Sequence, residues 1–491
     1  MNSEAHITAR NAFKVLYLRV SQFPILLLFV LIIPRMMGPE LYGKYAFMSS
    51  LLIILSMFTG LGTIEIFGRF IPELKSKNEI PKIHKLFSNT LFFKIIFSTI
   101  ISITFFLIFY FFTPEGYDRI YFLIIAVALL IYGIEGTLYA FLFGLNEMGK
   151  FTSRDLLRRI FSLVFIIVMF KYFELFGAIL AILLIELALL SFAIIWSRKY
   201  LHFEKFDFHF LKPYLKFGLL FFLSSSLLIF SQRFGNLLIQ FISQNPNEIA
   251  FFDIANQIFL INSMFFFFLF SSFIPIFTTL LIKNREDKIQ KWSSIILKNS
   301  GIICMFVLIS ILLVGSDLIN LIFGIEYKKV IINLIVLYFG IFPLLVAQIG
   351  IIFSIVYNKP KKYLIALSFA IITFLINSFL FIPKYGSVGC SIATVCSSIV
   401  FGLAMYIQFR KNISSYALKD SMKIFVIGLL FIPFIFFKGN IMTNLLLVIL
   451  FVIIFSIILF KIGILNINEI KEIIDAIIRH PNKTVTIEDS R

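Results

Sequence analysis

The chain has 491 residues, of which 60% are hydrophobic and only 14% are charged, and its mean hydropathy is +0.99. Soluble domains are about 45–50% apolar and about 25% charged, so this composition excludes a soluble globular protein and leaves little material for a soluble domain. The net charge of +18 does not indicate nucleic-acid binding, because Lys and Arg lie mostly at the ends of apolar runs, as membrane topology requires.

Apolar runs long enough to cross a bilayer recur along the whole chain. A membrane helix needs about 20 mostly apolar residues, and by that measure the sequence predicts fourteen spans. The first run contains Arg19 and is followed by no small-residue cleavage site, so we interpret it as a retained span rather than a signal peptide. The predicted spans are residues 15–34, 44–66, 86–112, 120–145, 156–172, 175–196, 215–242, 250–282, 295–315, 330–357, 361–383, 387–409, 421–437 and 442–461.

The segments between these spans alternate between many and few cations. When cations in the first or last five residues of a span are counted with the adjacent segment, the N-terminal side of the membrane holds 34 of the 44 Lys and Arg residues, and the other side holds 8. Because the cytoplasmic loops of membrane proteins are enriched in Lys and Arg, this alternation predicts that both termini are cytoplasmic. It also supports the number of spans, since one missed span would disturb it.

Short motifs recur at an offset of a little over 200 residues. A near-constant offset predicts two halves of six spans each, related as parallel repeats, and in such architectures the substrate lies between the halves. The recurring pairs are Gly38-Pro39-Glu40 with Asn245-Pro246-Asn247-Glu248, Ile71-Pro72 with Ile274-Pro275, and Lys171-Tyr172 with Lys384-Tyr385, at offsets of 207, 203 and 213 residues.

These observations predict an all-α polytopic membrane protein with two pseudo-symmetric six-helix bundles and two extra C-terminal helices. Isoleucines at helical spacing after residue 466 predict an amphipathic helix on the cytoplasmic face, and a solvated helical tail is an equal alternative. The predicted domains are residues 1–200 for spans one to six, 201–410 for spans seven to twelve, 411–465 for the last two spans, and 466–491 for the tail.

A polar stripe interrupts the seventh predicted span. Gln232, Asn236 and Gln240 recur every four residues, and Arg233 precedes Asn236 by three, so all four share one face of a helix. An arginine at mid-bilayer costs about 2.5–3.5 kcal/mol on insertion scales, so this side chain should face protein or water. We expect the stripe to line a polar cavity for anionic cargo, and an ion pair between helices is the alternative.

Two further cations lie inside apolar runs. Arg19, with Gln22 one turn later, is the equivalent of Arg233 in the first span of the first half. Lys94 is isolated among apolar residues. It is a candidate for the same cavity, with snorkelling or pairing to a carboxylate as the alternatives.

Two carboxylates occupy equivalent predicted spans of the two halves. Glu65 lies in the second span and Asp253 in the eighth. They are candidates for binding a coupling proton or cation, or for pairing with Arg19 and Arg233, and pairing is slightly favoured. Glu135 and Glu186 are weaker candidates of the same kind.

The sequence contains no pattern that indicates a metal, a nucleotide or a catalytic centre. The three cysteines lie in apolar runs without metal-ligand spacing, and the five histidines lie outside the apolar cores. No H-E-x-x-H or nucleotide-binding motif occurs in a suitable context. We expect no metal, no cofactor and no enzymatic activity.

Several stretches resemble one family. Residues 33–46, which read IPRMMGPELYGKYA, resemble the loop between the first two spans of bacterial polysaccharide-export flippases of the Wzx or O-antigen translocase type. Residues 60–62 and 69–73 continue the resemblance, and residues 382–395 are similar to the family's IPxYGxxGxAxAT stretch. The resemblance covers nearly the whole chain and departs at residues 250–252, where the family usually has Gly followed by Tyr.

This family belongs to the multidrug/oligosaccharidyl-lipid/polysaccharide (MOP) exporter superfamily, and the resemblance implies its MATE-like fold. It also implies a flippase that moves undecaprenyl-diphosphate-linked oligosaccharide, the repeat unit of O-antigen, capsule or exopolysaccharide, from the cytoplasmic to the outer leaflet of the bacterial inner membrane by alternating access. The partners implied are that lipid-linked oligosaccharide, membrane lipids and a glycan polymerase or ligase of the same pathway, and no nucleic acid. Guanidinium groups suit a diphosphate because they hydrogen-bond it in a bidentate manner.

Two other transport functions compete with this hypothesis. A MATE-like small-molecule or cation antiporter predicts acidic cavity residues, which Glu65 and Asp253 provide but which Arg233 contradicts. A flippase for a lipid II-type peptidoglycan precursor would carry similar diphosphate chemistry. A membrane glycan polymerase or ligase is disfavoured, because no large outer loop and no His outside the cytoplasm occur in the predicted topology.

Overall fold

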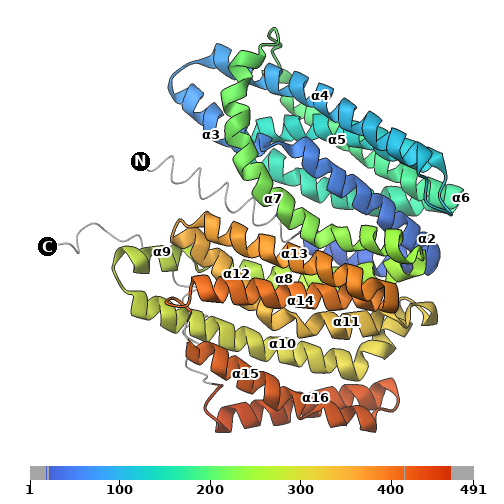
Figure 1. The fold of residues 1–491 in the computed structure, drawn as a ribbon, viewed down its shortest axis with the longest axis vertical. Coiled ribbons are helices and arrows are strands. Elements are labelled where there is room, and N and C mark those ends of the chain that lie inside the picture. The colour runs from blue at the N-terminus through green and yellow to red at the C-terminus, as the bar shows by residue number, and fades with distance from the viewer. Residues whose placement is uncertain (1–17, 19–20, 414, 466–491) are drawn as a thin grey trace. The chain divides into compact units, whose positions relative to one another are not determined.

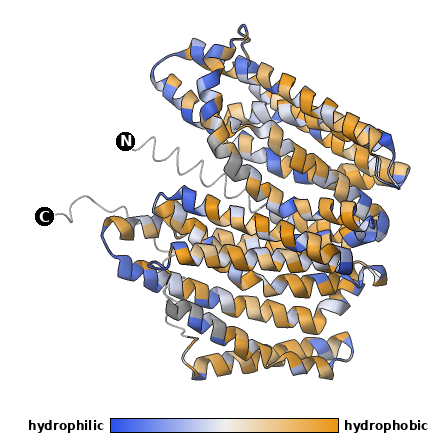
Figure 2. Ribbon diagram, viewed as in Figure 1, coloured by the Kyte–Doolittle hydropathy of each residue, from blue (hydrophilic) through white to orange (hydrophobic). Residues whose placement is uncertain are grey.

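The computed structural model describes residues 18, 21–413 and 415–465, and these form helices joined by short turns, with no strand in the part described (Figure 1). Apolar residues cover most of the helix lengths, and hydrophilic residues gather at helix ends and turns (Figure 2). Helices are favoured in such a chain because they satisfy every backbone hydrogen bond within one segment. The helices are α2 (Gln22–Gly60), α3 (Thr63–Ser76), α4 (Ile80–Phe111), α5 (Arg119–Gly144), α6 (Met148–Ser197), α7 (Phe208–Ser243), α8 (Pro246–Ser271), α9 (Ile274–Ile282), α10 (Glu286–Ile322), α11 (Val330–Phe339), α12 (Ile341–Val356), α13 (Pro360–Tyr385), α14 (Ser387–Gln408), α15 (Ser415–Leu429) and α16 (Ile441–Lys461), with 3-10 turns η1 (Arg198–Tyr200), η2 (Ile325–Tyr327) and η3 (Ile432–Phe437).

Two of the helices each contain two spans. The backbone leaves helical geometry at Gly38 within α2 and at Glu174 within α6, at the two places where the sequence predicts a boundary between spans. Helices α11 and α12 form one span bent by 49°. With these divisions, and with α3 and α9 as extensions of the spans before them, the described residues contain fourteen spans. The all-α polytopic fold with fourteen membrane helices is therefore confirmed, and the chain is a multi-pass membrane protein.

The described residues divide into two compact units. Unit 1 comprises residues up to Ile254 together with Ser378–Cys390, and unit 2 comprises Ala255–Asn377 and the residues from Ser391 onward. The packing of α7 against α2 places α7 in unit 1, whereas the repeat in the sequence assigns it to a second lobe that begins at residue 201. The functional boundaries at 200, 410 and 465 stay predictions, and the tail from 466 lies outside the described residues.

An aromatic and aliphatic core joins helices α3 to α6 in unit 1. The rings of Phe87 and Phe141 lie 4.3 Å apart, and Phe67 meets Phe141 edge-to-face at 5.8 Å. All three side chains are fully buried. Such ring pairs add about 0.5–1.5 kcal/mol beyond the area that they bury, and they hold the helices that carry the polar groups described below.

The junction of α2 and α3 packs directly against the backbone of α7. Leu61 and Gly62 both adopt left-handed backbone conformations, which end α2 and begin α3. A Cβ atom on Gly62 would lie 2.1 Å from the carbonyl oxygen of Gly218. Glycine is therefore required at position 62 both for its φ of 67° and for this close backbone contact.

The connection between α6 and α7 is tied to the N-terminal end of α4. Ser88 donates a hydrogen bond to the carbonyl oxygen of His202 and accepts one from the backbone N–H of Glu204, both at 2.9 Å. Asn89 accepts one from the backbone N–H of Asp207. The Asp207 carboxylate caps α7 by accepting from Phe210 N–H at 3.1 Å.

Helix α10 is the central packing element of unit 2. It contacts α15 and α16 along its length (Figure 1). A Cβ atom on Gly428 would lie 2.0 Å from the terminal methyl group of Met305, so the small residue lets α15 approach α10 closely. Asn444 of α16 donates a 2.6 Å hydrogen bond to Asp317 of α10.

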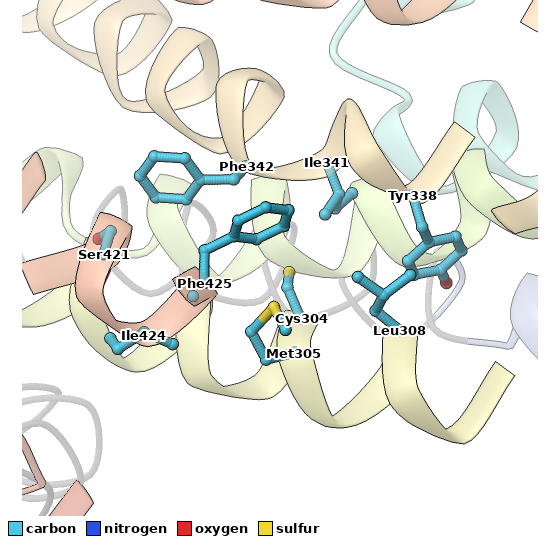
Figure 3. A pocket seen from close by; sticks show the side chains of 10 residues that line it. Cys304, Met305, Leu308, Tyr338, Ile341, Phe342, Ser421, Ile424 and Phe425 are labelled. Atoms are coloured by element: carbon cyan, nitrogen blue, oxygen red, sulfur yellow. The ribbon is translucent and has the colours of Figure 1, made fainter. Parts of the chain in front are cut away.

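A small cavity lies within unit 2 among α10, α11, α12 and α15 (Figure 3). Its volume is about 10 Å³, enough for about one water molecule. Cys304, Met305 and Phe425 contribute to its largely apolar lining. The cavity is a packing defect between helices and cannot hold an oligosaccharide or a diphosphate.

The turns at Glu174 and Gly386 occupy equivalent places in the repeat. Both adopt positive φ angles, 48° at Glu174 and 55° at Gly386. Glu174 follows Lys171-Tyr172, and Gly386 follows Lys384-Tyr385, which are the matching pairs of the sequence repeat. Glycine adopts this conformation without cost, whereas glutamate adopts it with strain.

Candidate functional site: a buried carboxylate among arginines

Asp253 of α8 is the centre of a polar cluster in unit 1. Its side chain is nearly fully buried. The hydroxyl of Tyr42 donates to Oδ2 at 2.7 Å, and the amide of Asn236 donates to Oδ1 at 2.8 Å. The Nη1 atom of Arg233 lies 3.4 Å from Oδ1. The sequence leaves open whether Asp253 pairs with Arg233, and the structure brings them together.

A close approach of α2 to α8 makes this cluster geometrically possible. A Cβ atom on Gly43 would lie 1.8 Å from the carbonyl oxygen of Pro246, so the two backbones touch where α8 begins. Tyr42, next to Gly43, is thereby placed to reach Asp253, which lies two turns further along α8. Arg233 and Asn236 reach the same carboxylate from α7, because residues three apart share a helix face.

Arg233 offers hydrogen-bonding capacity that the cluster does not use. Its side chain is 26% exposed. Only Nη1 makes a hydrogen bond, to Asp253, and the other two guanidinium nitrogen atoms bond to no residue that the structure describes. A guanidinium group presents five N–H donors in a planar fork that matches a phosphate or carboxylate. Arg233 can therefore bind an anion with the donors that remain.

A second arginine lies in the electrostatic neighbourhood of Arg233. Arg159 of α6 interacts with Arg233 and with Tyr45, a buried neighbour of the Asp253 carboxylate. Within the described ranges, Arg159 makes no ion pair or hydrogen bond. Sequence reasoning missed it by counting it among the cytoplasmic cations, although it falls four residues into the predicted span 156–172, and that position was the available signal.

The remaining residues of the stripe do not all join the cluster. Asn236 is buried and also donates to Ser50 at 2.9 Å, and its Oδ1 atom accepts no hydrogen bond from a described residue. Gln240 is buried two turns from Gln232 and accepts a 2.9 Å hydrogen bond from Tyr117. Gln232 is exposed.

The other predicted candidates lie elsewhere or outside the described residues. Lys94 of α4 is buried and donates to the carbonyl oxygen of Thr59, and its charged neighbours include Arg154 and Glu135 rather than Asp253. Glu65 lies in the first turn of α3, where a carboxylate stabilises the positive end of the helix. Arg19 lies outside the described residues.

Glu135 and Glu186 form a separate buried ion-pair network. Arg154 approaches Glu135 with Nε at 3.0 Å, and Arg158 approaches both carboxylates with Nη2 at 3.0 Å from each. The two glutamates are 0% and 1% exposed. Because each guanidinium group here binds carboxylates through two of its nitrogen atoms, this network has the arrangement of a structural ion pair, whereas Arg233 binds through one nitrogen only.

No metal centre is formed in the described part of the chain: no group of three or more His, Cys, Asp or Glu side chains lies close enough together to hold an ion. The three cysteines are free thiols.

Several solved structures have a fold similar to that of this chain. A structure titled as the lipid II flippase MurJ in an inward closed conformation has a TM-score of 0.71 at 16% identity, covering 93% of this chain and 100% of that one. An inward-facing MATE family transporter of the MOP superfamily has a TM-score of 0.64 at 16% identity, covering 79% of this chain and 93% of that one. An outward-facing MATE transporter of the same superfamily has a TM-score of 0.54 at 16% identity, covering 82% and 94%.

These likenesses confirm the MATE-like fold that the motifs led us to expect. No curated protein sequence matches the chain. The family described as polysaccharide biosynthesis protein matches residues 8–281, which is more than half of the chain. The fourteen-helix fold and this match lead to one assignment, that the chain belongs to the polysaccharide biosynthesis protein family.

Proposed function

We propose that the protein is a flippase that moves undecaprenyl-diphosphate-linked oligosaccharide from the cytoplasmic to the outer leaflet of the bacterial inner membrane. The observation that carries the proposal is Arg233, a partly exposed arginine within a membrane helix whose guanidinium group keeps most of its donors unused by described residues. A partly exposed cation of this kind in a membrane span marks a binding site or a pathway. The family and the fold support the same class of function.

The chemistry of the cargo matches this site. A diphosphate is anionic and carries at least two non-bridging oxygen atoms on each phosphorus, so it takes bidentate hydrogen bonds from the planar fork of arginine. Arg233 and the neighbouring Arg159 provide two guanidinium groups, with Gln232 as an exposed amide close by on α7. Arg19 is the predicted counterpart in the first span, and Lys94 is less suited, because it is buried against Thr59.

A test in cells separates this function from its alternatives. In a strain that lacks the gene, we expect lipid-linked oligosaccharide to accumulate, identified by mass spectrometry, and wild-type protein to restore the surface glycan. Arg233→Ala should abolish export and Arg233→Lys should retain part of it, because a positive charge is needed at this place. Arg119→Ala is the matched control, since Arg119 is exposed and stacks on Tyr110 at 4.7 Å. Normal surface glycan in the Arg233→Ala strain at normal protein level would remove Arg233 from the mechanism.

A lipid II-type cargo is the second candidate, favoured by the TM-score of 0.71 to a structure titled as a lipid II flippase. The same mass spectrometry distinguishes the two, because the lipid that accumulates would be a peptidoglycan precursor. A MATE-like cation antiporter predicts instead that Asp253→Asn abolishes transport while Arg233→Ala does not.

Topology and partners follow from the proposal. The excess of Lys and Arg on one side supports cytoplasmic termini, which reporter fusions at each end would test. A glycan polymerase or ligase of the same pathway would consume the product on the outer leaflet. No cofactor is part of the proposed mechanism.

A further inference from the structure

The hydrogen bonds around Asp253 are unequal. Tyr42 and Asn236 approach its two oxygen atoms at 2.7 and 2.8 Å, whereas Arg233 approaches at 3.4 Å and through one nitrogen only. Charge-assisted hydrogen bonds between arginine and carboxylate usually measure about 2.7–2.9 Å and are often bidentate. Tyr42 and Asn236 are therefore closer donors to this carboxylate than Arg233 is.

This inequality determines what happens if Arg233 moves away. A buried carboxylate that loses its sole partner is strongly destabilised. Asp253 would instead keep a donor on each oxygen, from Tyr42 and from Asn236. Breaking the long Arg233 contact therefore does not leave the buried carboxylate without a donor, and the arginine can be drawn away by a competing anion.

We propose that Asp253 is an internal counter-ion that competes with the anionic head group of the cargo for Arg233. Without cargo, the carboxylate pairs with the guanidinium group through one long contact. When a phosphate arrives, Arg233 turns its donors to the phosphate, and Tyr42 and Asn236 retain Asp253. This inference rests on the function proposed above. It adds a means by which the same site limits its affinity for the anionic head group of the cargo.

Competition between Asp253 and the cargo for Arg233 helps a transporter to release its cargo. A carrier that binds its cargo too tightly cannot release it, and every partner of the bound arginine other than the cargo raises the dissociation constant. Asp253 acts through Arg233, so it is a positioning residue rather than a cargo ligand.

Binding of inorganic pyrophosphate to the purified full-length protein in nanodiscs, measured by calorimetry at low salt, tests the inference. We expect Asp253→Asn, which keeps the shape of the side chain, to tighten binding about tenfold, equivalent to about 1.4 kcal/mol. In an Arg233→Ala background the same change should leave the affinity unaltered, since the competition acts through that arginine. Asp317→Asn is the matched control, because Asp317 also accepts a hydrogen bond from an asparagine but lies in unit 2.

Tyr42→Phe gives a readout that a merely structural role would not produce. Removing the hydroxyl leaves Asp253 more dependent on Arg233, so pyrophosphate should bind several-fold more weakly, opposite in sign to Asp253→Asn. If both variants weaken binding alike, Asp253 serves the fold and the inference is overturned.

The binding measurements distinguish a failure of this inference from a failure of the proposed function. Equal affinities for wild type and Asp253→Asn, with weaker binding by Arg233→Ala, would refute the counter-ion and leave the anion site intact. Pyrophosphate affinity that is undetectable in every variant, or unchanged by Arg233→Ala, would overturn both.

Discussion

Arg158 and Glu186 form a two-pronged ion pair in the interior of unit 1, in which Nη2 lies 3.0 Å from Oε2 and Nη1 contacts Oε1. Removing one partner of such a pair leaves a buried charge without compensation. We expect Arg158→Leu to lower the free energy of unfolding by about 3 kcal/mol, at the low end of the usual range because Arg158 is 27% exposed. Thermal unfolding in detergent measures the change.

The double variant Arg158→Leu/Glu186→Leu is the informative control for that pair. Because it removes both charges, it should be more stable than Arg158→Leu alone. Equal or greater destabilisation in the double variant would show that the contribution comes from packing rather than from charge.

Gly62 and Gly60 provide a matched test of the α2–α3 junction. A Cβ atom on Gly62 would meet the backbone of Gly218, whereas one on Gly60 would meet no atom within 4 Å. Gly62→Ala should therefore cost about 3 kcal/mol, from overpacking and a positive φ. Gly60→Ala should be neutral or slightly stabilising, because alanine favours the helix. Similar melting temperatures for the two variants would contradict the close contact.

Glu174→Gly should stabilise the protein. The residue is exposed, and its φ of 48° with ψ of −132° is a conformation that only glycine adopts readily. Relief of strain worth about 1–3 kcal/mol is partly offset by the entropy that glycine loses on folding, so we expect a net gain of about 1 kcal/mol. Gly386→Ala, at the equivalent turn, should destabilise and serves as the reciprocal control. A lower melting temperature for Glu174→Gly would refute the strain.

The cap of α7 should make stability depend on pH. A hydrogen bond from Lys85, at 2.7 Å, and the backbone N–H of Phe210 hold the pKa of Asp207 below its usual value. A lowered pKa stabilises the folded state above the unfolded pKa of about 3.9, and this contribution is lost as the pH falls through the lower folded value. The melting temperature of wild type should exceed that of Asp207→Asn at pH 7, and the difference should narrow as the pH falls below about 3.9. A difference in melting temperature that is unchanged at low pH would show that the Asp207 cap stabilises the helix through its geometry rather than through its charge.

The sequence predicted the number and order of spans because each apolar run must be about as long as the bilayer is thick. It located the breaks near Gly38 and Glu174 through turn residues and single charges. Helical spacing also placed Arg233 and Asn236 on one face, but spacing cannot identify what that face contacts. Asp253 is twenty residues from Arg233 in the chain, and only the packing of α8 against α2 and α7 decides which carboxylate an arginine reaches.

The cations near span boundaries were the main omission. Arg154, Arg158 and Arg159 follow one another within a turn and a half, so they looked like a loop cluster that faces the cytoplasm. Their side chains are long enough to reach polar groups inside the bundle, and two of them reach Glu135 and Glu186. An error of a few residues in the predicted end of a membrane span can thus make a buried charged residue look like a solvated one.

The connection at residues 201–207 has a practical consequence for handling the protein. Each side of Lys205 keeps its own attachment to α4, through Ser88 before it and through Asn89 and Lys85 after it. A cut made there by trypsin, or a gene divided at this point into two co-expressed pieces, should leave the pieces associated and co-purifying. The same anchoring makes this connection a poor place for a fluorescent or affinity insertion, in spite of its exposure.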